Sequence, residues 1–241
     1  MNKSIKAIVA VMLTVVAVVV IGCHKPDEPN NGGNNGNNDT IEEYEYVDLG
    51  LPSGTLWATC NVGADSIEDP GDYFAWGETV TKELYDWKSY KYSAYVDGRY
   101  LLNKYCTNPF CGYDGFVDNL TVLEPGDDVA TANWGENWRM ATGDEWRELY
   151  QNTTCELTTQ NGALGRLLTS WNGNSIFLPA TGFYMDNELI CTNLDLYWTS
   201  SLQTDSQVSA WSFHSDWDNC HVCGTYERCL GLCVRAVRAC Q

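Results

Sequence analysis

The sequence has few basic side chains and very few histidines. It carries 14 Lys and Arg against 32 Asp and Glu, which gives a formal net charge of −18 over 241 residues. Nucleic acid and anionic membrane surfaces are poor partners for such a charge, because both repel an acidic protein. Only three histidines are present, and no Gly-x-Ser-x-Gly motif accompanies them. Ser-His-Asp hydrolysis is therefore not indicated, and we recognise no catalytic constellation.

A single long apolar run lies near the amino end. Lys3 and Lys6 precede it, it covers residues 7–21, and Gly22 and Cys23 follow. At about 15 residues the run is shorter than the roughly 20 residues that a helix needs to span a bilayer, and no basic stop-transfer flank follows it. A basic start, an apolar middle and a small residue are the features of an export signal, so we expect residues 1–22 to be a signal peptide.

The end of this run, Val-Ile-Gly-Cys at 20–23, resembles the lipobox of bacterial lipoproteins. The resemblance implies that Cys23 is diacylated, becomes the first mature residue and anchors the chain stably in a membrane. Residues 23–42 are a tether rich in Asn and Gly, which has too little apolar surface to fold. Its acidic pair, Asp27 and Glu28, resembles surface-export signals of some Gram-negative lipoproteins. We expect an outer-membrane, lipid-anchored protein exposed at the cell surface.

Ten cysteines remain when Cys23 is set aside. An even number in an exported domain indicates up to five disulfides, and the loop between Cys106 and Cys111 predicts one local bridge. A zinc site built on Cys220, Cys223 and their neighbours is the alternative, since paired thiolates bind zinc. Oxidation outside the cytoplasm favours disulfides. The ten candidates are Cys60, Cys106, Cys111, Cys155, Cys191, Cys220, Cys223, Cys229, Cys233 and Cys240.

Residues 43–241 form one uninterrupted stretch of single-domain size. Apolar and polar residues alternate in several segments bounded by Gly, Pro, Asn or Asp, which predicts strands. These segments are 44–49, 55–59, 72–76, 175–178, 182–185, 196–200, 208–213 and 233–237. A capping box at 142–145 predicts one helix, and leucines at helical spacing predict a second near 160–171. Strands around about two helices, joined by long loops, indicate an α+β fold.

Several short blocks of this stretch resemble the major paralogous (FISUMP-type) domain of bacterial lipoproteins. They are VDLGL at 47–51, WATCNVGA at 57–64, GDYFAWGET at 71–79, NWGENWRM at 133–140, TQNG at 159–162, NSIFLPATG at 174–182, YWTSS at 197–201 and GLCVRAVR at 231–238. The resemblance implies a C-type-lectin-like fold, here with disulfide-stapled loops, related to that of formylglycine-generating enzymes. Ala141, Cys233 and Ala236 depart from the family pattern. The two reactive cysteines of those enzymes, four residues apart, are not reproduced, so we expect no enzyme.

Acidic and amide side chains gather late in the chain. Asp216, Asp218 and Asn219 surround Trp217, and their oxygens suit calcium. The order resembles the Trp-Asn-Asp motif with which calcium-binding lectins hold sugars, although no Glu-Pro-Asn partner motif precedes it. An acidic surface turn is the simpler interpretation. We expect no cofactor other than this candidate calcium ion.

Nine aromatic residues lie between positions 85 and 113, in a stretch without strong strand or helix signals. Exposed rings would stack on sugars or anchor a protein, whereas buried rings would replace scarce aliphatic side chains in the core. We take Trp87, Tyr90, Tyr92 and Tyr95, together with Trp217, as candidate ligand contacts. Trp57, Trp76, Trp138 and Trp198 are expected in the core.

Thr40 and Ser66 each lie in an Asp-Ser/Thr-Ile tripeptide, which resembles an O-glycosylation acceptor. The hypothesis that unites these observations is a lipid-anchored, non-enzymatic module whose loops bind a glycan or an envelope or host protein. Two alternatives stay open: an enzyme of the formylglycine-generating type that acts on envelope material, and a structural or adhesive envelope component.

Overall fold

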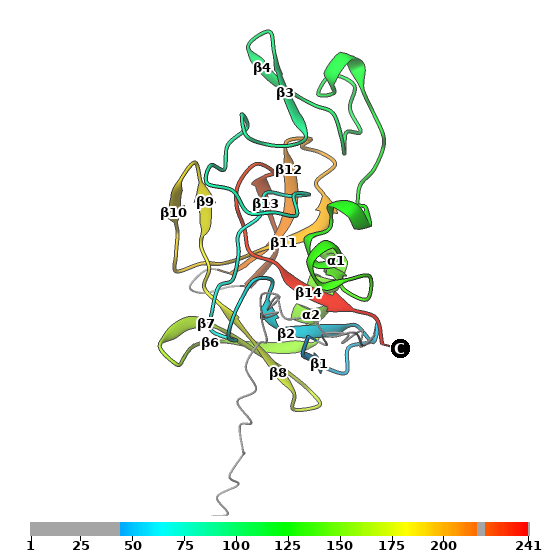
Figure 1. The fold of residues 1–241 in the computed structure, drawn as a ribbon. Coiled ribbons are helices and arrows are strands. Elements are labelled where there is room, and N and C mark those ends of the chain that lie inside the picture. Colours follow the sequence, from blue (N-terminus) through cyan, green and yellow to red (C-terminus); the bar gives the residue numbers. More distant parts are fainter. Residues whose placement is uncertain (1–43, 216–219, 241) are drawn as a thin grey trace, which may run out of the picture.

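The computed structural model describes residues 44–215 and 220–240. They form three small antiparallel sheets, two hairpins and four short helices (Figure 1). The predicted α+β class, rich in strands, is confirmed. Within the described residues, no helix is long and apolar enough to cross a membrane.

The first sheet joins the two ends of the domain. Its strands are β1 (Tyr46–Asp48), β2 (Leu56–Asn61), β14 (Arg235–Arg238) and β5 (Arg139–Met140), in that order. The carboxyl-terminal strand β14 lies between β2 and β5 and is antiparallel to both. Trp57 and Val237 are register partners at its centre, and both are fully buried.

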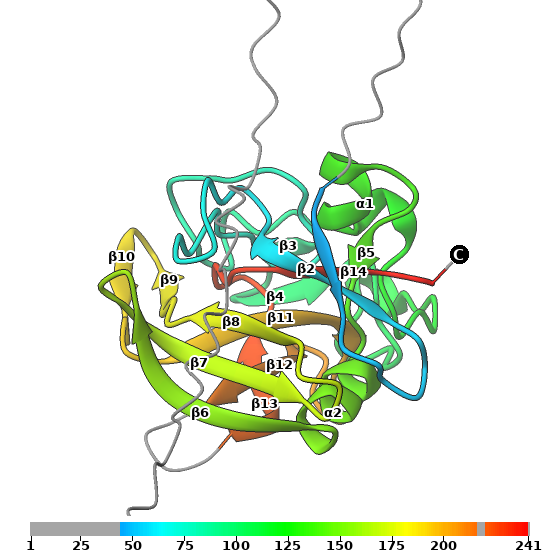
Figure 2. The same cartoon turned by 90° about the horizontal axis from the view of Figure 1, so that it is seen from below.

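The other two sheets are meanders of three strands each. One contains β6 (Thr153–Gln160), β7 (Ala163–Ser170) and β8 (Ser175–Pro179). The other contains β11 (Asp195–Leu202), β12 (Ser209–Ser215) and β13 (Cys220–Glu227). Seen from below, the first meander lies across the lower end of the molecule, beside β1 and β2 (Figure 2). Two separate hairpins complete the strands: β3 (Ser93–Val96) with β4 (Arg99–Leu102), and β9 (Phe183–Met185) with β10 (Glu188–Ile190).

The helices are α1 (Val129–Trp134) and α2 (Gly143–Gln151), with the 3-10 turns η1 (Tyr113–Gly115) and η2 (Pro125–Asp127). The capping box that predicts α2 is present: the Thr142 hydroxyl accepts from the amide of Glu145, whose carboxylate accepts from the amide of Thr142. These two bonds satisfy two backbone N–H groups that would otherwise be unpaired at the start of the helix.

The predicted helix at 160–171 is wrong, because β6 and β7 form a hairpin there. Asn161 and Gly162 turn the chain with φ of 45° and 91°. A two-residue Asn-Gly turn of this kind sets the twist of an antiparallel pair, and it overrides the leucine spacing. The predicted strand at 72–76 is also absent. A single bridge from Phe74 to Leu232 holds that segment.

Two aromatic-rich clusters fill the interior. One surrounds Trp76 and Trp198, and the other surrounds Trp57 and Trp146. In the second, Trp146 stacks on Phe213 with ring centroids 4.5 Å apart. The four tryptophans expected in the core are all buried, which confirms that aromatics replace aliphatic core residues here.

Arg235 is a fully buried cation that ties the first sheet to β8. Its guanidinium donates to Asn61 Oδ1 (2.8 Å) and to three backbone carbonyls: those of Ala58 (3.0 Å), Thr59 (2.9 Å) and Phe177 (3.0 Å). Burial lowers the pKa of Arg235 to about 10. The guanidinium stays charged at neutral pH because these oxygens replace the water that it loses.

Candidate functional site

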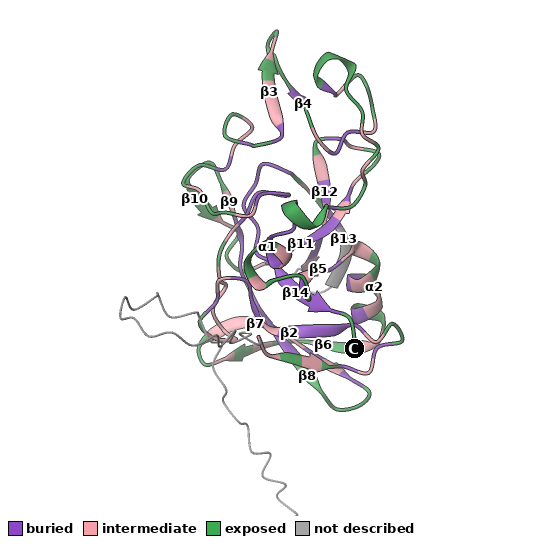
Figure 3. Cartoon of the chain, turned by 45° about the vertical axis from the view of Figure 1, so that its right-hand side comes forward, coloured by how far each residue is buried: buried purple, intermediate pink, exposed green. Residues whose placement is uncertain are grey.

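The hairpin β3–β4 protrudes from the end of the domain opposite β1 and β8 (Figures 1 and 3). Asp97 and Gly98 form its turn with φ of 49° and 83°, the two left-handed residues that a type I′ turn requires. This turn sets the register in which Tyr95 lies opposite Tyr100. The two rings therefore share one face of the hairpin, 4.9 Å apart, with exposed fractions of 65% and 37%.

Trp87 extends this pair of rings toward the domain. Its ring lies 6.3 Å from that of Tyr100, with an angle of 28° between the planes. Its indole nitrogen donates to Glu227 Oε2 (2.8 Å), so the polar edge is satisfied. Trp87, Tyr100 and Tyr95 consequently form a continuous row.

The loop beside the hairpin carries two further exposed rings, Phe110 (84% exposed) and Tyr113 (49%). Leu102 donates from its backbone amide to the carbonyl of Cys111 (2.8 Å), which fixes this loop to the end of β4. We call Trp87, Tyr95, Tyr100, Phe110 and Tyr113 together the aromatic crown. Exposed large rings gathered at one end are typical of an interaction site.

Asp118 holds the base of this loop. Its carboxylate accepts from the backbone amides of Tyr105 (2.7 Å), Cys106 (2.9 Å) and Leu120 (3.1 Å). A carboxylate that satisfies three amides replaces the backbone pairing that the loop lacks. The loop is therefore anchored, although it belongs to none of the sheets.

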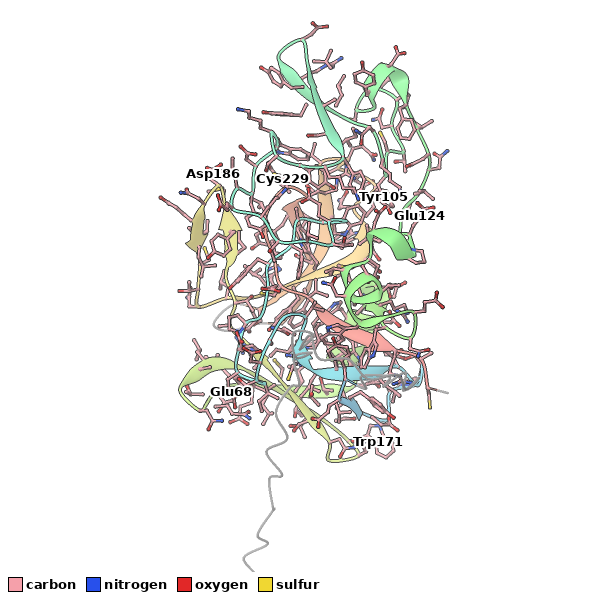
Figure 4. All side chains as sticks on the ribbon, viewed as in Figure 1. Glu68, Tyr105, Glu124, Trp171, Asp186 and Cys229 are labelled. Atoms are coloured by element: carbon pink, nitrogen blue, oxygen red, sulfur yellow. The ribbon has the colours of Figure 1, made fainter. Side chains whose placement is uncertain are left out.

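Asp127 is the buried carboxylate on which the base of the crown rests. It accepts from the hydroxyls of Tyr92 and Tyr105 (2.7 Å for Tyr105) and from the ammonium groups of Lys104 (2.5 Å) and Lys91 (3.3 Å). Burial alone would raise the pKa of Asp127, but these donors lower it to about 2. The group is a fixed negative charge at neutral pH. Figure 4 labels Tyr105 and Glu124 at this level, with Trp171 at the opposite end.

Arg228 lies fully buried beneath the same region. Its guanidinium is 5.6 Å from the ring of Trp76 and 5.7 Å from that of Tyr90, and its Nη1 donates to the carbonyl of Tyr105 (3.1 Å). Two ring faces and a carbonyl thus hold the cation, with no carboxylate in ion-pair contact among the described residues. Arg228 links the core to the base of the crown.

The structure separates the candidate ligand contacts into two groups. Tyr95 and Trp87 offer ring surface to solvent, whereas Tyr90 and Tyr92 are 2% and 6% exposed and pack in the core. The Tyr90 hydroxyl donates to the carbonyl of Trp76 (2.8 Å), so it is satisfied internally. Tyr90 and Tyr92 are therefore support rather than contact surface.

The calcium candidates Asp216, Asp218 and Asn219, with Trp217, lie outside the described residues, as do Thr40 and Cys23. Ser66 is partly exposed in a loop. In the described part of the chain, no three His, Cys, Asp or Glu side chains are arranged to hold a metal ion.

The cysteines differ from the expected complete pairing. Cys60 and Cys155 are disulfide-bonded. Five others are free thiols: Cys106, Cys111, Cys191, Cys229 and Cys233. The predicted local bridge between Cys106 and Cys111 is absent, and the Cys106 thiol donates to the carbonyl of Asn108 (3.1 Å) instead. Burial raises the pKa of the Cys229 thiol to about 12, so it is protonated and unreactive at neutral pH.

A pocket with a volume of about 570 Å³ lies between η2, α1 and β5. Leu123, Trp138 and Met140 supply apolar walls, and Arg139 lines one side while paired to Glu145 (2.5 Å). No sequence motif predicts this pocket. Ten of its eleven lining residues lie within 122–142, and Ser200 on β11 is the one contributed by a distant segment.

The chain has no match among protein-family models, curated proteins or solved structures.

Proposed function

We propose that this protein is a lipid-anchored, non-enzymatic binding module of the cell surface, and that the aromatic crown contacts its ligand, a glycan or a protein. In this proposal Cys23 carries the lipid and residues 23–42 space the domain from the outer membrane. The fold is C-type-lectin-like, and its loops present the ligand-binding side chains.

The observation that carries the proposal is the position of the crown relative to β1. The tether joins the domain just before β1, in the half of the molecule that contains β2 and β8, and the hairpin β3–β4 protrudes from the opposite end (Figure 1). A domain attached at one end presents the other end to its surroundings. Rings on that far end are therefore placed to meet a ligand.

The state of the rings supports the same proposal. Tyr95 and Phe110 expose 65% and 84% of their surface, whereas five of the nine described tryptophans are buried and Trp171, at the opposite end, is 79% exposed. Rigid rings with few rotatable bonds lose little conformational entropy on binding. Asp127 and Asp118 hold the crown in place before a ligand arrives, which lowers the ordering cost further.

The test compares one double variant and one single control variant of the full-length protein. Both are screened on a glycan array and against envelope and host proteins. Tyr95→Ala/Tyr100→Ala removes the ring pair, and Tyr150→Ala is the control, because Tyr150 on α2 is 37% exposed, as is Tyr100. Each screen is run with calcium and with a chelator. The proposal predicts that the double variant loses the ligand and the control keeps it. A double variant that binds all ligands as the wild type does would refute it.

A further inference from the structure

The basic side chains of this acidic protein gather beside the aromatic crown. Segment 87–104 contains one carboxylate, that of Asp97, and four basic residues: Lys88, Lys91, Arg99 and Lys104. The segment carries a formal charge of +3 in a chain of −18, and two of its four cations, Lys91 and Lys104, pair with Asp127 and Glu124. Every lysine in the part of the chain that the structure describes lies within residues 82–104.

Elsewhere in the described chain, the cations are buried or neutralised. Arg139 pairs with Glu145, and Arg147 on α2 pairs with Asp144. The remaining arginines have exposed fractions of 9% or less; they are Arg166, Arg228, Arg235 and Arg238. None of these is available to a ligand that approaches from solvent.

Lys88 and Arg99 are the exposed cations that form no ion pair within the described residues. Lys88 follows Trp87 at the base of the ring row, and Arg99 precedes Tyr100 near its tip. Strand alternation places Arg99 on the hairpin face opposite Tyr95 and Tyr100. Lys88 therefore lies at one end of the row. Arg99 lies beside the other end on the opposite face of the hairpin, where a ligand that extends past the hairpin edge would meet it.

Nearby carboxylates reduce this positive charge only in part. Asp86 is occupied by the amide of Ser89 (2.7 Å), and Glu227 accepts from Trp87. Asp97, in the turn, is exposed and next to the tip of the row. Asp114, next to Tyr113 of the crown, is exposed too, and a negatively charged ligand would have to approach both carboxylates.

We infer that the aromatic crown binds an acidic polysaccharide. Its sugar rings stack on Trp87, Tyr100 and Tyr95, and its carboxylates meet Lys88 beside the row and Arg99 where the chain passes the hairpin edge. This inference rests on the proposed binding function and narrows its ligand. Aromatic faces accept the C–H faces of sugars, and exposed cations select the acidic ones by attraction at short range.

A polysaccharide fits this surface better than a folded protein does. The hairpin has four residues in each strand and presents a narrow row of rings. A stable protein interface buries about 800 Å² on each partner and centres on a packed apolar core with pockets. A row of separated rings flanked by charges instead matches a linear chain of repeating units.

The experiment measures binding of the full-length protein, in detergent micelles, to polygalacturonate and alginate, each beside its fully esterified and thus uncharged form. Lys88→Gln/Arg99→Gln removes both free cations. Asp97→Asn removes the opposing carboxylate, and asparagine tolerates the left-handed turn position. Arg147→Gln is the control, because Arg147 is a 45% exposed cation far from the hairpin in sequence and on α2.

The inference predicts that an acidic form binds at least about five-fold more tightly than its ester, and that 0.3 M salt removes most of this preference. Lys88→Gln/Arg99→Gln should abolish the preference, Asp97→Asn should increase it about two-fold, and Arg147→Gln should leave it unchanged. Equal binding of acid and ester, or no binding of either acid, would overturn the inference. If acid and ester bind equally and Tyr95→Ala/Tyr100→Ala loses both, the proposed binding function stands and only the acidic ligand class fails.

Discussion

Replacing Asp127 by Asn removes the buried charge under the aromatic crown while keeping the shape of the side chain. Asp127 is 6% exposed and accepts from two tyrosine hydroxyls and two lysines. Its pKa falls from the ordinary 3.8 to about 2 on folding. A difference of this size corresponds to about 2 kcal/mol of folding free energy, since one pKa unit is worth about 1.4 kcal/mol.

The contribution has a definite pH dependence. Because folding lowers the pKa of Asp127, its stabilisation is fully present above pH 3.8 and disappears as the pH falls through about 2. The difference in unfolding free energy between wild type and Asp127→Asn should therefore be about 2 kcal/mol at pH 7, about half of that at pH 3, and small at pH 2.

Urea unfolding of both proteins, followed by tryptophan fluorescence at these pH values, provides the measurement. Asp114→Asn is the control, because Asp114 is an exposed carboxylate in the same loop and should change the unfolding free energy by less than about 0.5 kcal/mol. The reasoning is refuted if Asp127→Asn is as stable as the wild type at pH 7, or if its deficit persists undiminished at pH 2.

Further predictions concern the core, the anchor and the thiols. Arg235→Met should lower the unfolding free energy by about 3 kcal/mol, because four hydrogen-bond acceptors lose their donor. Arg147→Met on the surface should change the unfolding free energy little. Equal effects of the two variants in urea unfolding would contradict the role of Arg235. Cys23→Ser should move the protein from the membrane fraction to the soluble fraction, and a variant that still sediments with membranes would exclude the lipid anchor. Thiol titration of the denatured, unreduced protein should find at least five thiols, whereas none would indicate the complete pairing predicted from the sequence.

Local sequence signals predicted part of the fold well. The capping box at Thr142 and Glu145 marks the start of α2, because capping depends only on residues three apart. The Asn161-Gly162 turn is also local, yet the spacing of leucines near it suggested a helix. The turn overrides that spacing, and β7 then pairs with β8 as well, a partner supplied by a different segment. Strand β14 depends in the same way on β2, far away in the sequence.

The sequence located the aromatic stretch of the candidate site but could not sort its rings. Tyr90 and Tyr92 resemble Tyr95 in their neighbours, and all three were candidates for ligand contact. Tyr90 and Tyr92 are buried, whereas Tyr95 is exposed. Trp76 and Asp127, from other segments, accept the hydrogen bonds that the hydroxyls of Tyr90 and Tyr92 donate. The Asp97-Gly98 turn was the one local signal for the pairing of Tyr95 with Tyr100, since it fixes the hairpin register.

The central claim is that the aromatic crown contacts the ligand. Its most direct test measures the affinity of Tyr95→Ala/Tyr100→Ala for the strongest ligand found on the glycan or protein screens. Tyr150→Ala and the wild type are measured beside it. Calorimetry should show at least about a ten-fold loss for the double variant, as truncation of contact rings commonly produces, with unchanged urea unfolding. Tyr150→Ala should bind as the wild type does. An unchanged affinity for the double variant, or an equal loss for Tyr150→Ala, would contradict the claim.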